Sequence, residues 1–319
     1  MIICITGATG FIGQRLALRH LALGDSVRIF SRRSVAESGL PKSLEWYGGD
    51  LAGDDSLVSF VRGADVLYHC AGEIRDPSKM EALHITGTHR LAAVASGVIG
   101  RWVQLSSVGV YGPVHSGFIT DRSKINPIGP YEITKERSDQ IVVDAANKGG
   151  FSYSILRPSN VYGPRMTNQS LFNLIAMIHR GLFFFIGKPG ASANYIYVDN
   201  VVEALINCGA LDSAKGKIFN LSDYSTLEHL VEIISMALGC NFPKLRVPEP
   251  VASIAAKSLG WIPGFPLTQS RVNSLVNRSI YPITSIQQDL DYQHVVSMED
   301  GIRELVDVYK QLRLKRTLQ

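Results

Sequence analysis

Short runs of β-branched and aromatic residues alternate with amphipathic segments through the first half of the chain, and this alternation limits the fold more than any other feature. The expected strands are "MIICIT", "SVRIFS", "SLEWYG", "DVLYHC", "RWVQLSS" and "FSYSILR". Between most of them lie helical patterns such as "FIGQRLALRHLALG" and "MEALHITGTHRLAAVASG". The pattern predicts a doubly wound α/β fold, in which a parallel sheet carries helices on both faces and binds ligands at the carboxyl ends of its strands.

A glycine-rich turn, "TGATGFIG", follows the first expected strand and opens the first helix. Gly7 allows the tight turn, Gly10 lets the backbone approach a pyrophosphate, and Gly13 lets the helix pack on the strand. The phosphates would bind the unpaired N–H groups of the helix, which begins near Phe11 and Ile12. The turn therefore predicts a Rossmann-type sheet that binds a dinucleotide.

The regular alternation ends near residue 164, which predicts two lobes. We expect residues 1–164 to form the dinucleotide-binding domain, with 194–222 returning to it through a last strand, "KIFNLSD". Residues 165–193 and 223–319 are expected to form a smaller, discontinuous lobe that covers the ligand edge and binds the substrate. Its expected elements are a helix over 170–180, the helix "TLEHLVEIISMALG", a proline-punctuated stretch to Pro266 and a final helix from Met298.

Composition narrows the class of protein. Hydrophobic residues make up 45% and charged residues 19%, and the net charge of +4 is dense only in "RLKRT", so no nucleic-acid partner is indicated. Cys4, Cys70, Cys208 and Cys240 have no paired spacing, which argues against a metal site or disulfides. The longest apolar run, "LFNLIAMIHRGLFFFIG", is too short to span a bilayer. We expect a soluble, cytoplasmic protein.

Further segments follow the glycine turn in a recognisable order: "GGDL", "YHCAG", "LSSVGVYG", "YEITK", "LRPSNVYGP" and "YIYVDNVVEAL". Together they resemble the motifs of the extended short-chain dehydrogenase/reductases, the NAD-dependent epimerase/dehydratase family. The resemblance covers most of the chain. It implies that Asp50 and Leu51 contact the adenine of the cofactor, and that Ala71, Gly72 and Pro158 line its path.

Tyr131 and Lys135 lie at i and i+4 of a helical pattern, so both side chains project from one face. A nearby ammonium and a positive nicotinamide are expected to lower the pKa of the Tyr131 phenol from about 10 and make it a general acid/base. The resemblance implies that Lys135 also hydrogen-bonds the nicotinamide ribose and that Ser107 holds the substrate oxygen. Ser106 is the alternative, because strand alternation turns only one serine into the cleft.

The stretch "VRIFSRR" bears on the choice of cofactor. An acidic residue at the end of the second strand often binds the adenosine ribose of NAD, but this chain has Ser31 followed by Arg32 and Arg33. Ser31 removes a repulsive carboxylate, and Arg32 can pair with a 2′-phosphate. Strand alternation is expected to point Arg33 away. The stretch predicts NADP as the preferred cofactor, with NAD as the alternative.

Two departures from the family pattern bear on the reaction. Val108 and Gly109 stand where the sugar-nucleotide 4,6-dehydratases have an acidic pair, so the resemblance excludes dehydration. His84 replaces an asparagine that many relatives have in the segment "HITGT". It could order the active-site water network or simply pack there.

Other positions bear on the substrate. Asn160 matches a substrate-side asparagine of the family, whereas Ala193 replaces the arginine that grips the substrate diphosphate in sugar-nucleotide epimerases. Arg271 is the candidate that we assign to the substrate site in its place. Lys188 and Arg165 are further sources of positive charge.

These features predict an NAD(P)-dependent enzyme that acts on a carbinol or keto carbon of a nucleotide sugar, either a 4-keto reductase or a 4-epimerase. A reductase of hydrophobic alcohols, similar to 3β-hydroxysteroid dehydrogenases, is the alternative, because "FFFIGKPG" and "LTQSRVNSLVNRSIY" have an apolar character. A non-catalytic dinucleotide-binding scaffold would not need the proton-relay residues.

The resemblance also implies a homodimer in which the helices at 83–97 and 131–147 pack against their symmetry mates.

Overall fold

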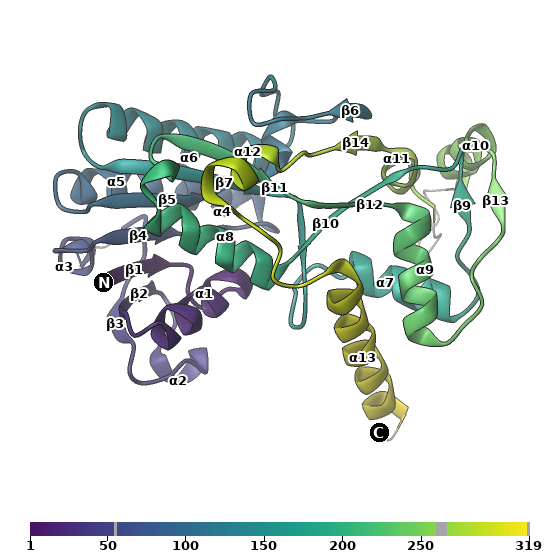
Figure 1. The fold of residues 1–319 in the computed structure, drawn as a ribbon, viewed down its shortest axis with the longest axis horizontal. Coiled ribbons are helices and arrows are strands. Elements are labelled where there is room, and N and C mark those ends of the chain that lie inside the picture. The colour runs from purple at the N-terminus through teal and green to yellow at the C-terminus, as the bar shows by residue number, and fades with distance from the viewer. Residues whose placement is uncertain (54–55, 260–266, 318–319) are drawn as a thin grey trace.

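The computed structural model describes residues 1–53, 56–259 and 267–317. Within these residues the larger lobe is built on a seven-stranded sheet in the order β11-β7-β5-β4-β1-β2-β3, and every neighbouring pair runs parallel (Figure 1). The strands are β1 (Ile2–Thr6), β2 (Ser26–Ser31), β3 (Glu45–Gly48), β4 (Val66–His69), β5 (Arg101–Leu105), β7 (Ser152–Pro158) and β11 (Lys217–Leu221). The predicted doubly wound α/β sheet is confirmed.

Helices cover both faces of this sheet, as the alternation predicted. The helices of the larger lobe are α1 (Phe11–Ala22), α2 (Val35–Ser38), α3 (Leu57–Val61), α4 (Pro77–Met80), α5 (Thr88–Ala95), α6 (Pro130–Asn147) and α8 (Val198–Ala210). One buried cluster joins Leu16 of α1 and Leu205 of α8 to Ile5 of β1. A second cluster joins Leu91 of α5 to Trp102 of β5 on the opposite face. The direction of strand progression reverses between β1 and β4, which is where a sheet of this type opens a crevice for a ligand.

The segment expected to be one amphipathic helix over 80–97 is interrupted. α4 is followed directly by a π-helical segment, Glu81–Gly87, and only then by α5. A π-helical turn holds more residues than an α-helical turn, so it rotates the side chains that come after it, and such turns are frequent at functional sites. His84 lies at the centre of this segment and is 1% exposed.

The smaller lobe is assembled from separate pieces of the chain. In the described residues, β8 (Asn160–Tyr162), β10 (Ser192–Tyr197) and β12 (Asp223–Thr226) form one sheet, β9 (Phe185–Ile186) pairs with β13 (Arg246–Val247), and β6 (Ser116–Phe118) pairs with β14 (Arg278–Ile280). Its helices are α7 (Ser170–His179), α9 (Leu227–Leu238), α10 (Glu249–Leu259), α11 (Gln269–Val276) and α13 (Met298–Thr317). Leu230, Ile234 and Leu305 are buried where α7, α9 and α13 pack together.

The chain crosses between the two lobes more than once, and the sequence indicated one of these crossings, the return to the sheet through β11. β10 pairs within the smaller lobe, whereas α8 packs on the seven-stranded sheet and β11 extends it. α12 (Thr284–Leu290) returns to the larger lobe and packs against β11, where Ile286 is fully buried. The end of the predicted proline-punctuated stretch, at Pro266, lies outside the described residues. Within the described ranges, no helix is both long and apolar enough to cross a bilayer.

Candidate active site

A cavity of about 960 Å³ lies along the carboxyl edge of the seven-stranded sheet. This volume is at the upper end of the range for ligand-binding pockets. The predicted catalytic, cofactor and substrate residues that line it are Gly7, Gly10, Phe11, Ile12, Gly13, Ser31, Arg32, Asp50, Leu51, Ala71, Gly72, Ser107, Tyr131, Lys135, Pro158 and Asn160. Arg271 is exposed on α11 and is not among the described residues that line the cavity.

The glycine turn between β1 and α1 leaves no room for a side chain at two of its positions. Gly7 has a φ of +71°, and a Cβ there would lie 2.6 Å from the backbone nitrogen of Ala71. A Cβ at Gly13 would lie 2.3 Å from the carbonyl oxygen of Gly7. α1 begins without a side-chain cap and without an acidic residue in its first turn. Its first N–H groups are therefore available to an anion, so this cradle fits the pyrophosphate of a dinucleotide.

The residues after β2 line another part of the same cavity. β2 ends at Ser31, whose hydroxyl accepts a hydrogen bond from the Arg33 nitrogen at 3.0 Å. Arg32 and Arg33 both line the cavity. The expectation that Arg33 points away from Arg32 and contributes less to cofactor binding stays a prediction. The Arg32 guanidinium lies 4.0 Å from the Asp50 carboxylate, and both side chains are exposed, so this ion pair is weak.

The two serines after β5 have different partners. The Ser106 hydroxyl donates to the buried Asp139 carboxylate at 2.7 Å. The Ser107 hydroxyl accepts from the Gly109 nitrogen at 3.1 Å, and it lies close enough to hydrogen-bond the Tyr131 phenol. Both serines line the cavity, but the hydroxyl of Ser106 is committed to Asp139. This geometry supports Ser107 as the residue that holds a substrate oxygen.

The protein surroundings of the Tyr131 phenol raise its pKa. Burial, followed by the charges of Glu132 and Asp139, raises the pKa of Tyr131 to about 12, while the hydrogen bond from Ser107 lowers it. Desolvation of the phenolate is the largest of these effects. The phenol is consequently protonated at neutral pH. The expected lowering by Lys135 together with a positive nicotinamide stays a prediction.

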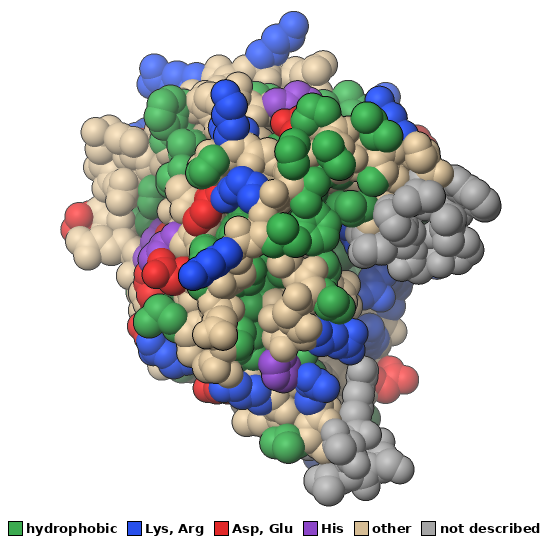
Figure 2. Space-filling model, turned by 90° about the vertical axis from the view of Figure 1, so that its right-hand side faces the viewer, with side chains coloured by type: hydrophobic (Ala, Val, Ile, Leu, Met, Phe, Trp, Pro, Cys, Tyr) green, Lys and Arg blue, Asp and Glu red, His purple; other side chains and the backbone are tan. Residues whose placement is uncertain are grey.

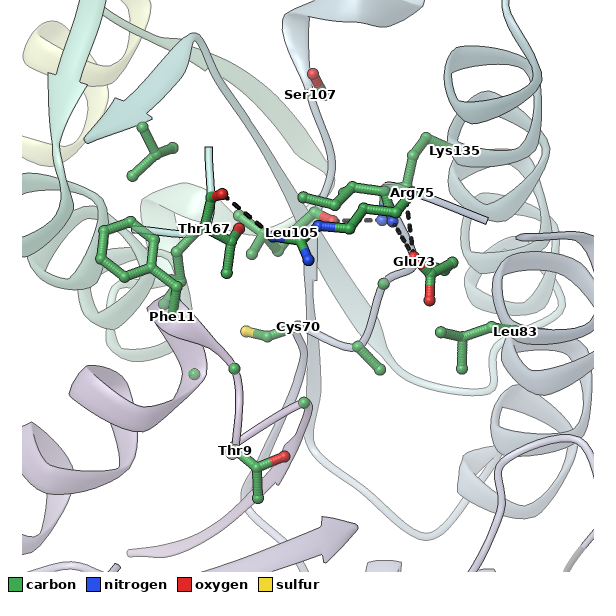
Figure 3. A pocket seen from close by; sticks show the side chains of 18 of the residues that line it. Thr9, Phe11, Cys70, Glu73, Arg75, Leu83, Leu105, Ser107, Lys135 and Thr167 are labelled. Carbon is green, nitrogen blue, oxygen red and sulfur yellow. Dashed lines mark hydrogen bonds between the residues drawn. The ribbon is translucent and has the colours of Figure 1, made fainter. Parts of the chain in front are cut away.

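Lys135 is placed on the sheet side of Tyr131. It is 3% exposed, and its ammonium donates to the Leu105 carbonyl at 2.6 Å (Figure 3). Burial lowers the pKa of Lys135, whereas Asp139 and Cys70 raise it. The Leu105 carbonyl fixes the ammonium at the end of β5, directly below the cavity.

A buried charge network lies behind these residues, and our reading of the sequence missed it. The Arg157 guanidinium of β7 donates to the Asp139 carboxylate at 3.2 Å and to the Tyr111 hydroxyl at 3.1 Å. The Tyr111 hydroxyl in turn donates to the Asn220 side chain at 2.8 Å. Asp139 lies one helical turn after Lys135, so the spacing Tyr131–Lys135–Asp139 was the available signal.

A loop after β4 closes over the middle of the cavity, and its residues were also missed. The Glu73 carboxylate accepts hydrogen bonds from the backbone nitrogens of Ile74, Arg75 and Asp76, at 2.9, 2.8 and 3.3 Å. These bonds lower the pKa of Glu73. The Arg75 guanidinium extends across the cavity and donates to the Thr167 carbonyl at 3.2 Å (Figure 3). The loop therefore connects the cofactor side of the cavity to the smaller lobe.

The end of the cavity next to the smaller lobe is lined mainly by uncharged residues. Val161, Met166, Asn168 and Gln169 lie there, and the Asn160 amide donates to the Asn194 carbonyl at 3.1 Å. Ala193, where we expected the family's diphosphate-binding arginine, is 3% exposed. Within the described residues there is no cluster of side chains that could hold a metal ion.

Comparison with known proteins shows what the chain is similar to. The model of the NAD dependent epimerase/dehydratase family matches residues 3–222. A UDP-glucose 4-epimerase of Mycolicibacterium smegmatis is 25% identical, and the match covers 96% of this chain and 97% of that protein. The sterol demethylase protein B of Methylococcus capsulatus is 28% identical over 78% of each chain. The UDP-glucuronic acid 4-epimerase of Bacillus cereus, solved in complex with NAD, has a similar fold: the TM-score is 0.76, the identity is 20%, and the match covers 98% of this chain and 99% of that one.

Proposed function

Because the chain belongs to the NAD dependent epimerase/dehydratase family of extended short-chain dehydrogenase/reductases, we propose that it transfers hydride between a nicotinamide cofactor and a carbinol or keto carbon. The observation that carries this proposal is the meeting of Ser107, Tyr131 and Lys135 in one cavity with the glycine turn. A non-catalytic scaffold would not need a buried ammonium beside a phenol. The cavity volume of about 960 Å³ fits a dinucleotide together with part of a substrate.

The three polar groups have distinct roles in the proposed reaction. The Ser107 hydroxyl and the Tyr131 phenol bind the reacting oxygen of the substrate, and the phenol donates a proton to it or removes one. The Lys135 ammonium, held by the Leu105 carbonyl, supplies positive charge that stabilises negative charge developing on the phenol oxygen. The nicotinamide, when bound, donates or accepts the hydride. The protein therefore contributes orientation and proton transfer.

The site suits either a keto reductase or an epimerase, because both reactions transfer a hydride at one carbon and a proton at its oxygen. A reductase consumes reduced cofactor, whereas an epimerase interconverts substrate isomers without net consumption of it. Isomer formation without consumption of cofactor would exclude a simple reductase.

We propose a nucleotide sugar as the first candidate substrate. The similarity to a UDP-glucose 4-epimerase along nearly the whole chain supports this class. Asn160 and the amides of Asn168 and Gln169 provide hydrogen bonds that suit sugar hydroxyls. The test is NADPH oxidation with UDP-4-keto sugars, and isomer formation from UDP-glucose. If the protein turns over neither of these substrates, nucleotide sugars are excluded as its substrate class.

A hydrophobic alcohol or ketone is the second candidate, and several observations favour it. The expected diphosphate-binding arginine is replaced by the buried Ala193, and Met166 lines the substrate end. The outer surface of the smaller lobe also carries hydrophobic side chains among its lysines and arginines (Figure 2). The similarity to a sterol demethylase protein supports the same class. Turnover of a 3-ketosteroid, with none of UDP-4-keto sugars, would establish this candidate.

Arg32→Ala is expected to weaken NADPH binding about 10- to 150-fold and to leave NADH binding nearly unchanged. A charge-assisted hydrogen bond to a 2′-phosphate contributes roughly 1.5–3 kcal/mol, which is the origin of this range. Arg33→Ala is expected to give a smaller loss of the same kind, because Arg33 lines the same cavity. Ser31→Asp should shift the preference toward NADH, since its carboxylate repels the phosphate. Dissociation constants of both cofactors measure these effects; equal losses for NADPH and NADH on Arg32→Ala would contradict an NADP site.

We also expect a homodimer through α5 and α6. Ala93 on α5 is exposed and Ile141 on α6 is only partly buried, which is consistent with an apolar contact between copies. Light scattering at micromolar concentration should give twice the mass of the chain. Ala93→Arg should dissociate the dimer, whereas Leu18→Arg, on α1 at the opposite face, should not. A monomer mass for the wild type would exclude this interface.

A further inference from the structure

His84 occupies an unusual position at the centre of the π-helical segment. Its ring is 1% exposed and lies beneath the cavity, with both ring nitrogens hydrogen-bonded. Nε2 accepts from the backbone nitrogen of Glu73 at 2.9 Å. Nδ1 lies 2.8 Å from the Thr134 hydroxyl. The ring thus contacts two segments that are distant in the sequence.

The partners determine where the imidazole proton lies. A backbone N–H can only donate, so Nε2, which faces the Glu73 nitrogen, must be unprotonated. The Thr134 hydroxyl donates its single proton to a carbonyl of the preceding turn, at 2.8 Å from Pro130 or 3.1 Å from Tyr131. It must therefore accept from His84, so Nδ1 carries the hydrogen. The ring is a neutral imidazole with one donor and one acceptor, each used.

Both segments that His84 joins bear directly on the cavity. On one side is the loop 73–76, which the Glu73 carboxylate stiffens and from which Arg75 reaches Thr167. On the other side is the first turn of α6, which carries Tyr131. The Tyr131 ring packs edge-on against His84, with ring centroids 5.8 Å apart and an angle of 76° between the planes. The position of the phenol therefore depends on this imidazole through both packing and backbone.

We propose that His84 is a positioning residue: as a neutral hydrogen-bond bridge, it ties the loop 73–76 to the first turn of α6 and so fixes the Tyr131 phenol relative to the substrate. The effect on turnover rests on the proposed function, whereas the bridge itself does not. A positioning error on the order of 1 Å can lower a catalytic rate about a hundredfold. His84 is thus more than a packing residue.

The charged and titratable groups around His84 keep the ring neutral at ordinary pH. Burial, and then the Lys135 ammonium of α6, lower the pKa of His84 to about 3, and Glu73 opposes this only in part. Tyr131 of α6 and His69 of β4 also face this region, the latter uncharged because burial lowers its pKa as well. The bridge should therefore persist across about pH 5–8, and His84 should contribute no inflection to the pH–rate profile.

Substitutions with defined hydrogen-bonding capacity separate bridging from packing. The asparagine amide sits at the depth of His84 Nδ1, so His84→Asn can rebuild the bond to Thr134 but not the bond to Glu73; the longer glutamine of His84→Gln can rebuild the bond to Glu73. His84→Ala removes both, and Thr134→Val removes the acceptor at α6 while keeping the shape of the side chain. His20→Asn is the matched control, because His20 is also buried but pairs with Asp25 at 2.8 Å, away from the cavity.

Three measurements on the full-length protein test the proposal. ¹⁵N spectra of the histidine rings should show His84 with its proton on Nδ1 and no titration between about pH 5 and 8. Hydrogen exchange of the amides at 73–76 should accelerate at least about tenfold in His84→Ala and His84→Asn but remain near the wild-type rate in His84→Gln. Turnover should fall about 10- to 100-fold in His84→Ala and Thr134→Val, with NADPH affinity changed by less than about threefold, and should stay within about threefold in His20→Asn.

The outcomes distinguish failure of the bridge from failure of the proposed function. A proton on Nε2, a titrating His84, or equally fast amide exchange in the glutamine and alanine variants would overturn the bridge, whatever the substrate. Full turnover in His84→Ala would overturn the positioning role. If the wild-type protein turned over no ketone or nucleotide sugar, the proposed function would fail, and the positioning role with it. The ring spectra and the exchange rates would still decide the bridge.

Discussion

Tyr131→Phe is expected to lower kcat by about 10²- to 10⁴-fold while changing the dissociation constant of NADPH by less than about twofold. The substitution deletes the hydroxyl that donates the proton but keeps the ring and its edge-on contact with His84. The geometry of the cavity should therefore persist. The measurement is NADPH oxidation with whichever substrate the wild type reduces, together with cofactor titration followed by NADPH fluorescence.

Tyr111→Phe is a suitable control for Tyr131→Phe. Tyr111 is also a buried tyrosine with a hydrogen-bonded hydroxyl, but it does not line the cavity. We expect its replacement to cost about 1–3 kcal/mol of stability, because the Arg157 guanidinium and the Asn220 amide lose a partner. Its activity should stay within a few-fold of wild type. Retention of a tenth or more of wild-type activity by Tyr131→Phe would show that another group supplies the proton.

Arg157→Leu is expected to destabilise the protein by about 3–5 kcal/mol, because it leaves the Asp139 carboxylate buried without its cation. The side chains of this pair are only 2% and 5% exposed. Arg19→Leu is the control: Arg19 pairs with Glu203 at the surface, so its loss should cost no more than about 1 kcal/mol. Urea unfolding monitored by circular dichroism measures both. A cost below about 1 kcal/mol for Arg157→Leu would mean that solvent reaches Asp139.

The destabilisation by Arg157→Leu should depend on pH in a defined direction. Burial raises the pKa of Asp139, while Arg157 and Lys135 lower it. Loss of Arg157 raises that pKa further, so the folded variant binds a proton more readily than the unfolded chain. Stability of the variant relative to wild type should therefore increase as the pH falls from about 8 to about 5. Asp139→Asn in the Arg157→Leu background should remove this dependence.

The sequence specified the sheet and the cradle for the phosphates, because both follow from local rules. Strand–helix alternation requires parallel strands, and parallel strands place their carboxyl ends at one edge. The glycines at positions 7 and 13 are required by close backbone contacts within one turn, so their spacing is informative without any tertiary context. The same holds for Tyr131 and Lys135, which share a helix face through their spacing alone.

Groups that act across long sequence separations could not be derived from spacing. The sequence left Ser106 as the alternative to Ser107. The structure distinguishes them, because the Ser106 hydroxyl donates to the Asp139 carboxylate. Likewise, the sequence did not show whether His84 orders polar groups of the active site or only packs there. Its hydrogen bonds to Glu73 and Thr134 distinguish these roles.

The sequence by itself determined the fold, the position of the glycine turn and the shared helix face of Tyr131 and Lys135. Tertiary structure alone decided the electrostatics and the ordering of the cavity. It brought Arg33 to the same cavity as Arg32, and it raised the pKa of Tyr131, because burial of the phenol and the charges of Glu132 and Asp139 all disfavour the phenolate. The physical reason is that backbone geometry repeats over a few residues, whereas desolvation depends on every segment that packs around a group.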